Sequence, residues 1–258
     1  MEGAVLKSAK LRLHLLASRT HKWLAVIIGA QLLLWFTSGA LMSFLPIDRV
    51  HGDHLVERKA TTALPSHLAL ASPSAITAAT AAPIEAVTYR MWLGRAVAEV
   101  VTADGTRLVD ARTGAALPAP TASQAEAVAR AAWRGSSAQP KATVARIERA
   151  SAEYRGALPV WRVAFADPDS TRVFIAADTG RIAAVRTGTW RLYDFFWGLH
   201  IMDWKNHEDF NTPWLLAFAI GALALWAGGA VLLYMRWPRR RRRNAGNDPL
   251  YSRATHDR

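Results

Sequence analysis

Histidine is the residue type through which this chain could bind a metal or a redox cofactor. The sequence contains eight histidines and no cysteine, which excludes disulfides, thiolate metal sites and cysteine-bound iron–sulfur clusters. Neutral imidazole is the usual axial ligand of heme iron and a common ligand of divalent metals. Six of the histidines fall into three pairs beside two long apolar stretches: His14 and His21, His51 and His54, and His200 and His207.

The segment YDFFWGLHIMDW (193–204) makes His200 the first candidate ligand. An unpaired imidazole would be costly in so apolar a segment, so His200 should have a partner. One hypothesis is that His200 binds heme at one membrane surface, together with His51 or His54. At the other surface, His21 would pair with its own copy across a homodimer. The alternative is that these imidazoles only anchor the chain at the bilayer edge or bond backbone carbonyls.

The other motifs that carry catalysis are missing from the sequence. It shows no Ser–His–Asp order, paired buried carboxylates, phosphate loop or dinucleotide fingerprint. No catalytic residue and no metal site apart from heme is therefore predicted. Asp110 and Asp178 lie near Thr-Gly turns, where we expect them to accept local backbone hydrogen bonds.

Two uncharged apolar stretches must position the histidines. Residues 214–235 form a run of 22 residues without a charge, long enough at about 1.5 Å per residue to cross a hydrocarbon core of ~30 Å. Residues 23–47 are also uncharged. Ser38-Gly39-Ala40 resembles a signal-peptide cleavage site, but apolar residues continue to Leu45, which favours an uncleaved anchor.

The distribution of charge predicts the topology. The net charge is +12, yet residues 48–212 hold 19 basic and 17 acidic residues, so most of the excess lies in the two tails. Arg239 to Arg243 form the densest run. Basic residues next to a span stay in the cytoplasm, so both termini are predicted there, with loop 48–212 in the periplasm of a bacterial inner (cytoplasmic) membrane. The lipid bilayer, and no nucleic acid, is the expected partner of the tails.

The loop between the two apolar stretches reads as an α+β structure. Alternating apolar residues predict strands at 84–93, 95–102 and 106–117, with a hairpin at Asp104-Gly105. Thr121 can cap a helix that ends at Gly135, and four more strands follow between 142 and 187. Stretches 100–117 and 163–185 share one pattern, which indicates two copies of one unit.

Two smaller features concern how the helices pack. Residues 190–204 are too short and too charged to span, and are predicted to form an amphipathic helix at the outer interface. This helix would turn His200 toward His51 and His54. In the second span, small residues should face those of the first. The glycines concerned are Gly221, Gly228 and Gly229 on one side, and Gly29 and Gly39 on the other.

These observations define the predicted organisation of the chain. In order, it comprises a cytoplasmic basic arm (1–22), a transmembrane helix (23–47), a periplasmic juncture with the first unit (48–120), the second unit (121–188), the interfacial segment (189–210), a transmembrane helix (213–236) and an Arg-rich tail (237–258).

Several stretches resemble a known family. VWRVAFADPDSTRVFIAADTGRIAAV (160–185) resembles a PepSY domain, a helix followed by an antiparallel meander, and LVDARTGAAL (108–117) resembles it in the first copy. RTHKWLAVIIGAQLLLWFTSGALMSF (19–44) is similar to the opening helix of the PepSY-associated membrane family. YDFFWGLHIMDW (193–204) resembles that family's short Leu-His segment before a span. Together these stretches cover roughly residues 19–236.

The resemblance implies an α+β membrane protein in which two transmembrane helices flank a periplasmic tandem PepSY-like module. Some larger members are heme-containing reductases that release iron from siderophores, while others have no assigned activity. This chain has fewer spans than those reductases and no histidine within either span. Two functions follow. One is a heme-binding subunit or partner in the reduction of imported siderophore-iron; the other is a non-enzymatic tethered module that recognises a peptide, protease or other envelope partner.

Overall fold

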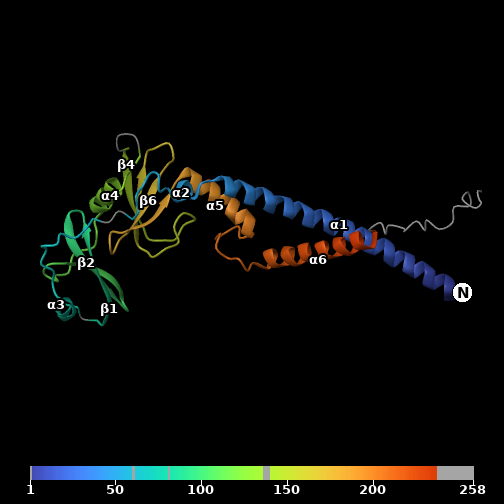
Figure 1. The fold of residues 1–258 in the computed structure, drawn as a ribbon, viewed down its shortest axis with the longest axis horizontal. Coiled ribbons are helices and arrows are strands. Elements are labelled where there is room, and N and C mark those ends of the chain that lie inside the picture. Colours follow the sequence, from blue (N-terminus) through green and yellow to red (C-terminus); the bar gives the residue numbers. More distant parts are fainter. Residues whose placement is uncertain (1, 60–61, 81, 136–139, 237–258) are drawn as a thin grey trace, which may run out of the picture. The chain divides into compact units, whose positions relative to one another are not determined.

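The computed structural model describes residues 2–59, 62–80, 82–135 and 140–236 (Figure 1). Side chains within this part are described from residue 22 to 230, and at Arg19. The chain divides into two compact units: Met1–Leu32 with Pro213–Arg258, and Leu33–Thr212. The first contains most of the two apolar helices, and the second contains the sheets and the segments that join them to the helices.

The first apolar stretch lies in one long helix, α1 (Glu2–Phe44), which includes the predicted basic arm. This helix ends at Phe44, before the predicted boundary at Ile47. Pro46 explains the difference, because the residue before a proline is pushed out of the helical region. Ile47 instead begins a separate short helix, α2 (Ile47–His51), whose N-cap is Pro46.

The second apolar helix, α6 (Pro213–Arg236), starts with the proline that favours a first helical position. In the described part of the chain, two segments are long and apolar enough to cross a membrane: Lys22–Phe44 and Pro213–Ala230. Only 11% of the first segment's apolar window and none of the second's is buried. A core helix of a soluble protein would be mostly buried, so their exposure favours contact with lipid.

The glycine packing predicted between the two apolar helices reduces to one close approach. A Cβ added at Gly221 would lie 2.7 Å from Ile28 Cδ1, so a larger residue there would require the Ile28 side chain to move. By contrast, an added Cβ at Gly29, Gly228 or Gly229 would meet no other atom within 4 Å. Of these four glycines, Gly221 is therefore the one at which the predicted approach between the two spans is seen.

The larger sheet lies against the predicted helix. Helix α4 (Ala122–Ala131) is capped by Thr121, whose hydroxyl accepts from Gln124 N while the Gln124 side chain bonds Thr121 N. The helix ends at Ala131 and not at Gly135, because Ala132 closes its last turn. Four antiparallel strands follow in sheet order: β4 (Ala142–Ile147), β5 (Val160–Phe165), β6 (Arg172–Ala176) and β7 (Ile182–Arg186).

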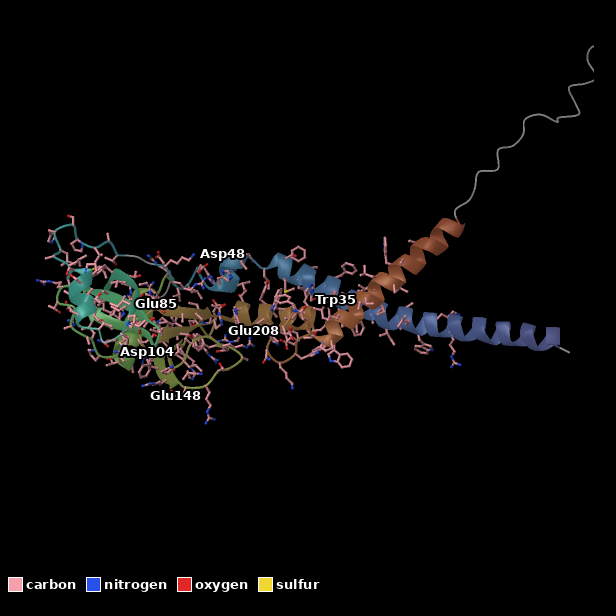
Figure 2. All side chains as sticks on the ribbon, turned by 90° about the horizontal axis from the view of Figure 1, so that it is seen from below. Trp35, Asp48, Glu85, Asp104, Glu148 and Glu208 are labelled. Atoms are coloured by element: carbon pink, nitrogen blue, oxygen red, sulfur yellow. The ribbon has the colours of Figure 1, made fainter. Side chains whose placement is uncertain are left out.

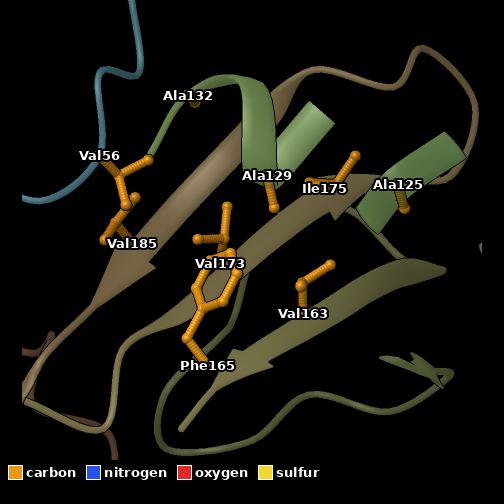
Figure 3. Packing of buried hydrophobic residues seen from close by; sticks show 9 residues of the cluster. All are labelled: Val56, Ala125, Ala129, Ala132, Val163, Phe165, Val173, Ile175 and Val185. Carbon is orange, nitrogen blue, oxygen red and sulfur yellow. The ribbon is translucent and has the colours of Figure 1, made fainter. Parts of the chain in front are cut away.

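The core between α4 and this sheet includes a residue from far upstream (Figure 3). Val56 is fully buried among Val163, Val173 and Val185. Backbone bonds from Glu57 N to Ala132 O and from Arg134 N to Leu55 O fix its segment beside the end of α4. The juncture after α2 therefore packs with the second sheet. The sequence-based prediction grouped it with the first unit. Two apolar residues among polar neighbours gave no pattern from which to find this.

The smaller sheet confirms the predicted hairpin at Asp104-Gly105. Strands β1 (Ile84–Trp92), β2 (Arg95–Thr102) and β3 (Gly105–Asp110) form an antiparallel meander, and α3 (Pro73–Ala78) contributes Ile76 to its core. Its helix has six residues where α4 has ten, and it has three described strands where the second sheet has four. The two units are therefore alike in plan but unequal in size.

The strongest structural sign of repetition is one backbone turn. Asp110 N bonds Ala115 O and Gly114 N bonds Asp110 O; in the second sheet, Ala176 N bonds Arg181 O and Gly180 N bonds Ala176 O. Asp110 thus corresponds to Ala176 and not to Asp178. Its carboxylate accepts from Arg112 N and Thr113 N, as predicted, and bonds from Arg95 and these amides lower its pKa to about 2. Asp178 is exposed.

A buried carboxylate joins the two sheets. Glu99 on β2 is 6% exposed and accepts from Arg90 on β1 and from Arg181 in the β6–β7 turn, at 2.6 and 2.7 Å. Beside it, Gly180 has a φ of +66°, and an added Cβ would lie 2.7 Å from Trp92 Nε1. Glycine is needed there both for its left-handed backbone and for the close approach of the indole.

Val56→Ala should lower the free energy of unfolding by about 2 kcal/mol, because it leaves a cavity among fully buried side chains. Denaturation of the full chain in detergent, followed by tryptophan fluorescence, measures this. Val26→Ala is the matched control, since Val26 is 61% exposed on α1. Equal effects of the two substitutions would show that Val56 is not a core residue.

Candidate functional site

The predicted interfacial helix is present as α5 (Gly188–Ile201), directly after β7. The Thr187 hydroxyl accepts from Trp190 N at its start, and the helix packs against α2 (Figure 1). It ends at Ile201, earlier than the predicted 204, because Met202 has a φ of +55°. A helix cannot continue through this left-handed residue.

Asp203 organises the turn that follows α5. Its carboxylate accepts backbone N–H bonds from Lys205, Asn206, Glu208 and Asp209. These bonds, with those from Glu208 and Asp209 strongest, hold its pKa well below the ordinary value. The segment between α5 and α6 is therefore an ordered loop, held by backbone N–H groups that donate to one charged carboxylate.

His200 has its partner on α1. Its Nδ1 lies 3.0 Å from Ser38 Oγ, and an added Cβ at Gly39 would lie 3.4 Å from its Cε1. Ser38 is within the candidate span Lys22–Phe44 and is 4% exposed. Although no histidine lies in a span by sequence, α5 thus brings an imidazole alongside one. Gly39, predicted to face the second span, provides room for the ring.

The hydrogen bonds around Ser38 bear on which ring nitrogen of His200 carries the proton. Ser38 Oγ also bonds Trp35 O at 3.1 Å, and a carbonyl can only accept. The hydroxyl has one proton and can donate it to one of these two acceptors; where it donates to Trp35 O, the bond to His200 needs an Nδ1–H donor. The other nitrogen, Nε2, then has a free lone pair. A histidine held through Nδ1–H in this way is oriented and polarised for metal binding through Nε2.

The other predicted ligands do not join His200 at this position. His51 lies 3.9 Å from Asp53 after α2 and is half-exposed, and His54 is exposed. The expectation that α5 would turn His200 toward them was wrong, because its imidazole is bonded to Ser38 on α1. The side chain of His21 lies outside the described residues. Among the described residues, no three His, Asp or Glu side chains are grouped to hold a metal ion.

Sequence reasoning missed a hydrogen-bonded pair in the same segment, formed by His207 and Asp194. His207 Nδ1 lies 2.8 Å from Asp194 Oδ2, and both side chains are largely buried. The ring packs on Gly198, where an added Cβ would lie 2.5 Å from it, and Trp197 Nε1 donates to His207 O. This pair closes the loop onto α5. The two residues are joined across a turn with no periodic spacing, so the sequence offered no signal for it.

Aromatic rings complete this segment. Tyr193 and Trp197 stack at 6.4 Å, and Trp197 meets Phe210 edge-on at 5.5 Å. Trp204 lies beyond the helix and is 59% exposed. Phe195 and Leu192 are also exposed on α5. Exposed aromatic and aliphatic side chains next to a span are typical of a membrane interface.

Glu153, between β4 and β5, ties α5 to the larger sheet. Its carboxylate accepts from Arg191 on α5 and from Arg172 on β6, both at 2.7 Å, and its carbonyl accepts from Arg186. Burial alone would raise the pKa of Glu153, but the bonds from Arg191 and Arg172 outweigh it and lower that pKa. The chain leading to His200 is thus fixed at both ends of α5.

Comparison with known proteins identifies the family. A family model described as the PepSY-associated TM region matches residues 18–257, nearly the whole chain. The chain belongs to the PepSY-associated transmembrane family. No curated protein and no solved structure shows significant similarity to it. Together with the two apolar helices, the family indicates that this PepSY-associated protein is a membrane protein of α+β architecture.

Glu153→Gln should destabilise this PepSY-associated protein by about 2 kcal/mol, a value reduced because Arg172 and Arg191 are partly solvated. The Glu153 pKa is lowered from 4.5, so its contribution is present above that pH and lost as pH falls through the folded pKa. Unfolding midpoints from pH 6 downward should therefore differ between wild type and variant most at the higher pH.

Glu148→Gln is the control, because Glu148 pairs with Arg146 at the surface and is 63% exposed. It should change stability little at any pH. Equal losses in the two variants would contradict the role assigned to Glu153.

Proposed function

We propose that this protein is a heme-binding subunit or partner in the reduction of imported siderophore-iron, in which His200 would hold the heme iron. The observation that supports the proposal is the pair of contacts at Ser38: with the hydroxyl proton on Trp35 O, His200 donates through Nδ1–H and its Nε2 is left unprotonated beside an apolar span. Heme is a flat, largely apolar group, and an aromatic segment at the bilayer edge suits it. Bound heme would supply one-electron chemistry at its iron.

The residues of the chain have distinct parts in this proposal. Ser38 orients the His200 ring, and Gly39 leaves space for it. His200 is bonded to Ser38 and His51 lies near Asp53, so we propose that a second ligand to the iron would come from another copy of the chain in a homodimer. His21 would serve in the same way at the opposite membrane surface.

We further propose that the protein lies in a bacterial inner membrane with both termini in the cytoplasm. The segment 48–212, with its tandem PepSY-like units, would then be periplasmic. Support comes from the 13 Lys and Arg residues in 1–22 and 236–258, compared with the near balance of charge between the helices.

An alkaline phosphatase fused to the C-terminus should be inactive, because that enzyme works only outside the cytoplasm. The same reporter inserted at Asp104, an exposed residue in the β2–β3 turn, should be active. An active C-terminal fusion would reverse the proposed topology.

Purified wild-type protein, produced with ample heme, should show a Soret band, and His200→Ala should abolish it or shift it because the axial nitrogen is lost. His67→Ala is the control, since His67 is exposed in the segment before α3. Ser38→Ala should keep the band but weaken heme affinity by about 10–100-fold, as expected when the group that orients a ligand is removed. Absence of the band in wild type would exclude the heme proposal.

A second function, a non-enzymatic tethered module that recognises a peptide, protease or other envelope partner, is favoured by a different observation. Glu99 joins the two sheets, and Glu153 joins the larger sheet to α5. A partner bound to either sheet would therefore be mechanically connected to the membrane-edge helix. If wild type binds no heme, this proposal takes precedence, and crosslinking at the sheets in whole cells is its test.

A further inference from the structure

Arginines gather on the face of the larger sheet opposite α4. In the strand register, Arg172 on β6 lies directly across from Arg186 on β7, and Arg162 on β5 is one pair further along the same face. Like charges placed directly opposite destabilise a sheet unless something neutralises them. Arg155, from the segment between β4 and β5, and Arg191, on α5, belong to the same group.

The acidic residues nearby leave part of this charge uncompensated. Glu153 pairs with Arg172 and Arg191, whereas the one acidic partner of Arg155 among the described residues is Glu208, at 3.5 Å, which is 61% exposed. Glu208 is labelled in Figure 2. Burial lowers the pKa of Arg186; Asp194 and Glu153 oppose this, while the positive charges of Arg58 and Arg155 add to it. Arg58 thus adds its positive charge to that of the five arginines on this face.

Two donors of this group lack an acceptor. Arg155 Nη2 and Arg162 Nε are both buried and have no hydrogen-bond partner among the described residues. Buried donors are nearly always satisfied in folded proteins, and an unsatisfied one indicates a missing water or ion. Next to several arginines, an anion is the acceptor that charge favours, and guanidinium geometry matches phosphate in particular.

The position of α5 places this group at the membrane surface. His200, near the C-terminal end of α5, lies at Ser38 in the span, while α5 also packs on α2, which follows the span. Residues 39–44 of α1 rise about 9 Å to the end of the span, and residues 191–200 of α5 cover about 13 Å in the opposite direction. With the hydrocarbon boundary placed at Phe44, the end of the span, Arg191 lies a few ångströms beyond it, at the level expected for headgroups.

We propose that the cluster of Arg155, Arg162, Arg172, Arg186 and Arg191 binds a phosphate group, supplied by the headgroup of an anionic phospholipid. The phosphate oxygens accept from the unsatisfied nitrogens of Arg155 and Arg162 and neutralise the facing pair Arg172 and Arg186. A lipid held there fixes the larger sheet against the bilayer. This site is independent of heme and of the proposed reduction.

The full chain is reconstituted in nanodiscs of phosphatidylcholine alone or mixed with phosphatidylglycerol, and thermal unfolding is followed by near-UV circular dichroism. Phosphatidylglycerol should raise the unfolding midpoint of wild type by about 3–6 °C. The double variant R155Q/R162Q should lose most of this shift. R107Q, which removes an exposed arginine from β3, is the matched control and should keep it.

A further arm adds inorganic phosphate to the phosphatidylcholine nanodiscs at constant ionic strength. A shift equal to that from phosphatidylglycerol would show that the site takes free phosphate, and would overturn the lipid source. No shift with either, or an equal lipid shift in R155Q/R162Q, would overturn the site itself. The last result would assign lipid binding to the basic tails, which all variants share.

If the double variant does not fold, R155Q and R155K are compared by native mass spectrometry of the intact protein with phosphatidylglycerol. R155Q should bind the lipid about tenfold more weakly, whereas R155K, which keeps the charge, should lose less. Equal lipid binding by wild type and both variants would overturn the proposal.

Discussion

One polar contact beside an apolar span, between His200 and Ser38, holds helix α5 to helix α1. An imidazole and a hydroxyl are costly in such surroundings unless each satisfies the other, and His200 and Ser38 do so at 3.0 Å. The bond fixes the C-terminal end of α5 to α1, while Glu153 fixes its N-terminal half to the larger sheet. Because α5 is held at both ends, the sheet, the loop around Asp203 and the end of α1 form one connected unit.

The same arrangement places two kinds of chemistry at two depths. Near the end of α5, the His200 imidazole lies against the span. Toward the start of the helix, Arg191 belongs to the arginine cluster that we propose to meet the lipid headgroups. A neutral ligand atom suits the apolar depth and a charged cluster suits the polar one, since each is placed where its desolvation is cheapest. The proposed order of the two sites along α5 thus matches the change in polarity from the hydrocarbon to the membrane surface.

Sequence patterns predicted the local elements and missed the contacts between them. Alternation in β1 to β7, the cap at Thr121 and the hairpin at Gly105 depend on near neighbours, and the strands and helices formed close to their predicted positions. Val56 in a distant core, Ser38 as the partner of His200 and Asp194 as the partner of His207 depend on tertiary approach. No spacing in the chain encodes those pairings. Asp178 is not the counterpart of Asp110 for a related reason: equivalent turns are defined by their backbone hydrogen bonds and not by a shared residue type.

The tautomer of His200 tests this account most directly. Nitrogen-15 spectra of histidine-labelled, heme-free protein in bilayers distinguish a protonated from an unprotonated ring nitrogen, and a His200→Gln sample identifies the signals of this residue. The account predicts a neutral ring with the proton on Nδ1 and a bare Nε2. A ring with its proton on Nε2 would contradict it, because Ser38 would then be the donor and the nitrogen proposed to bind iron would be blocked.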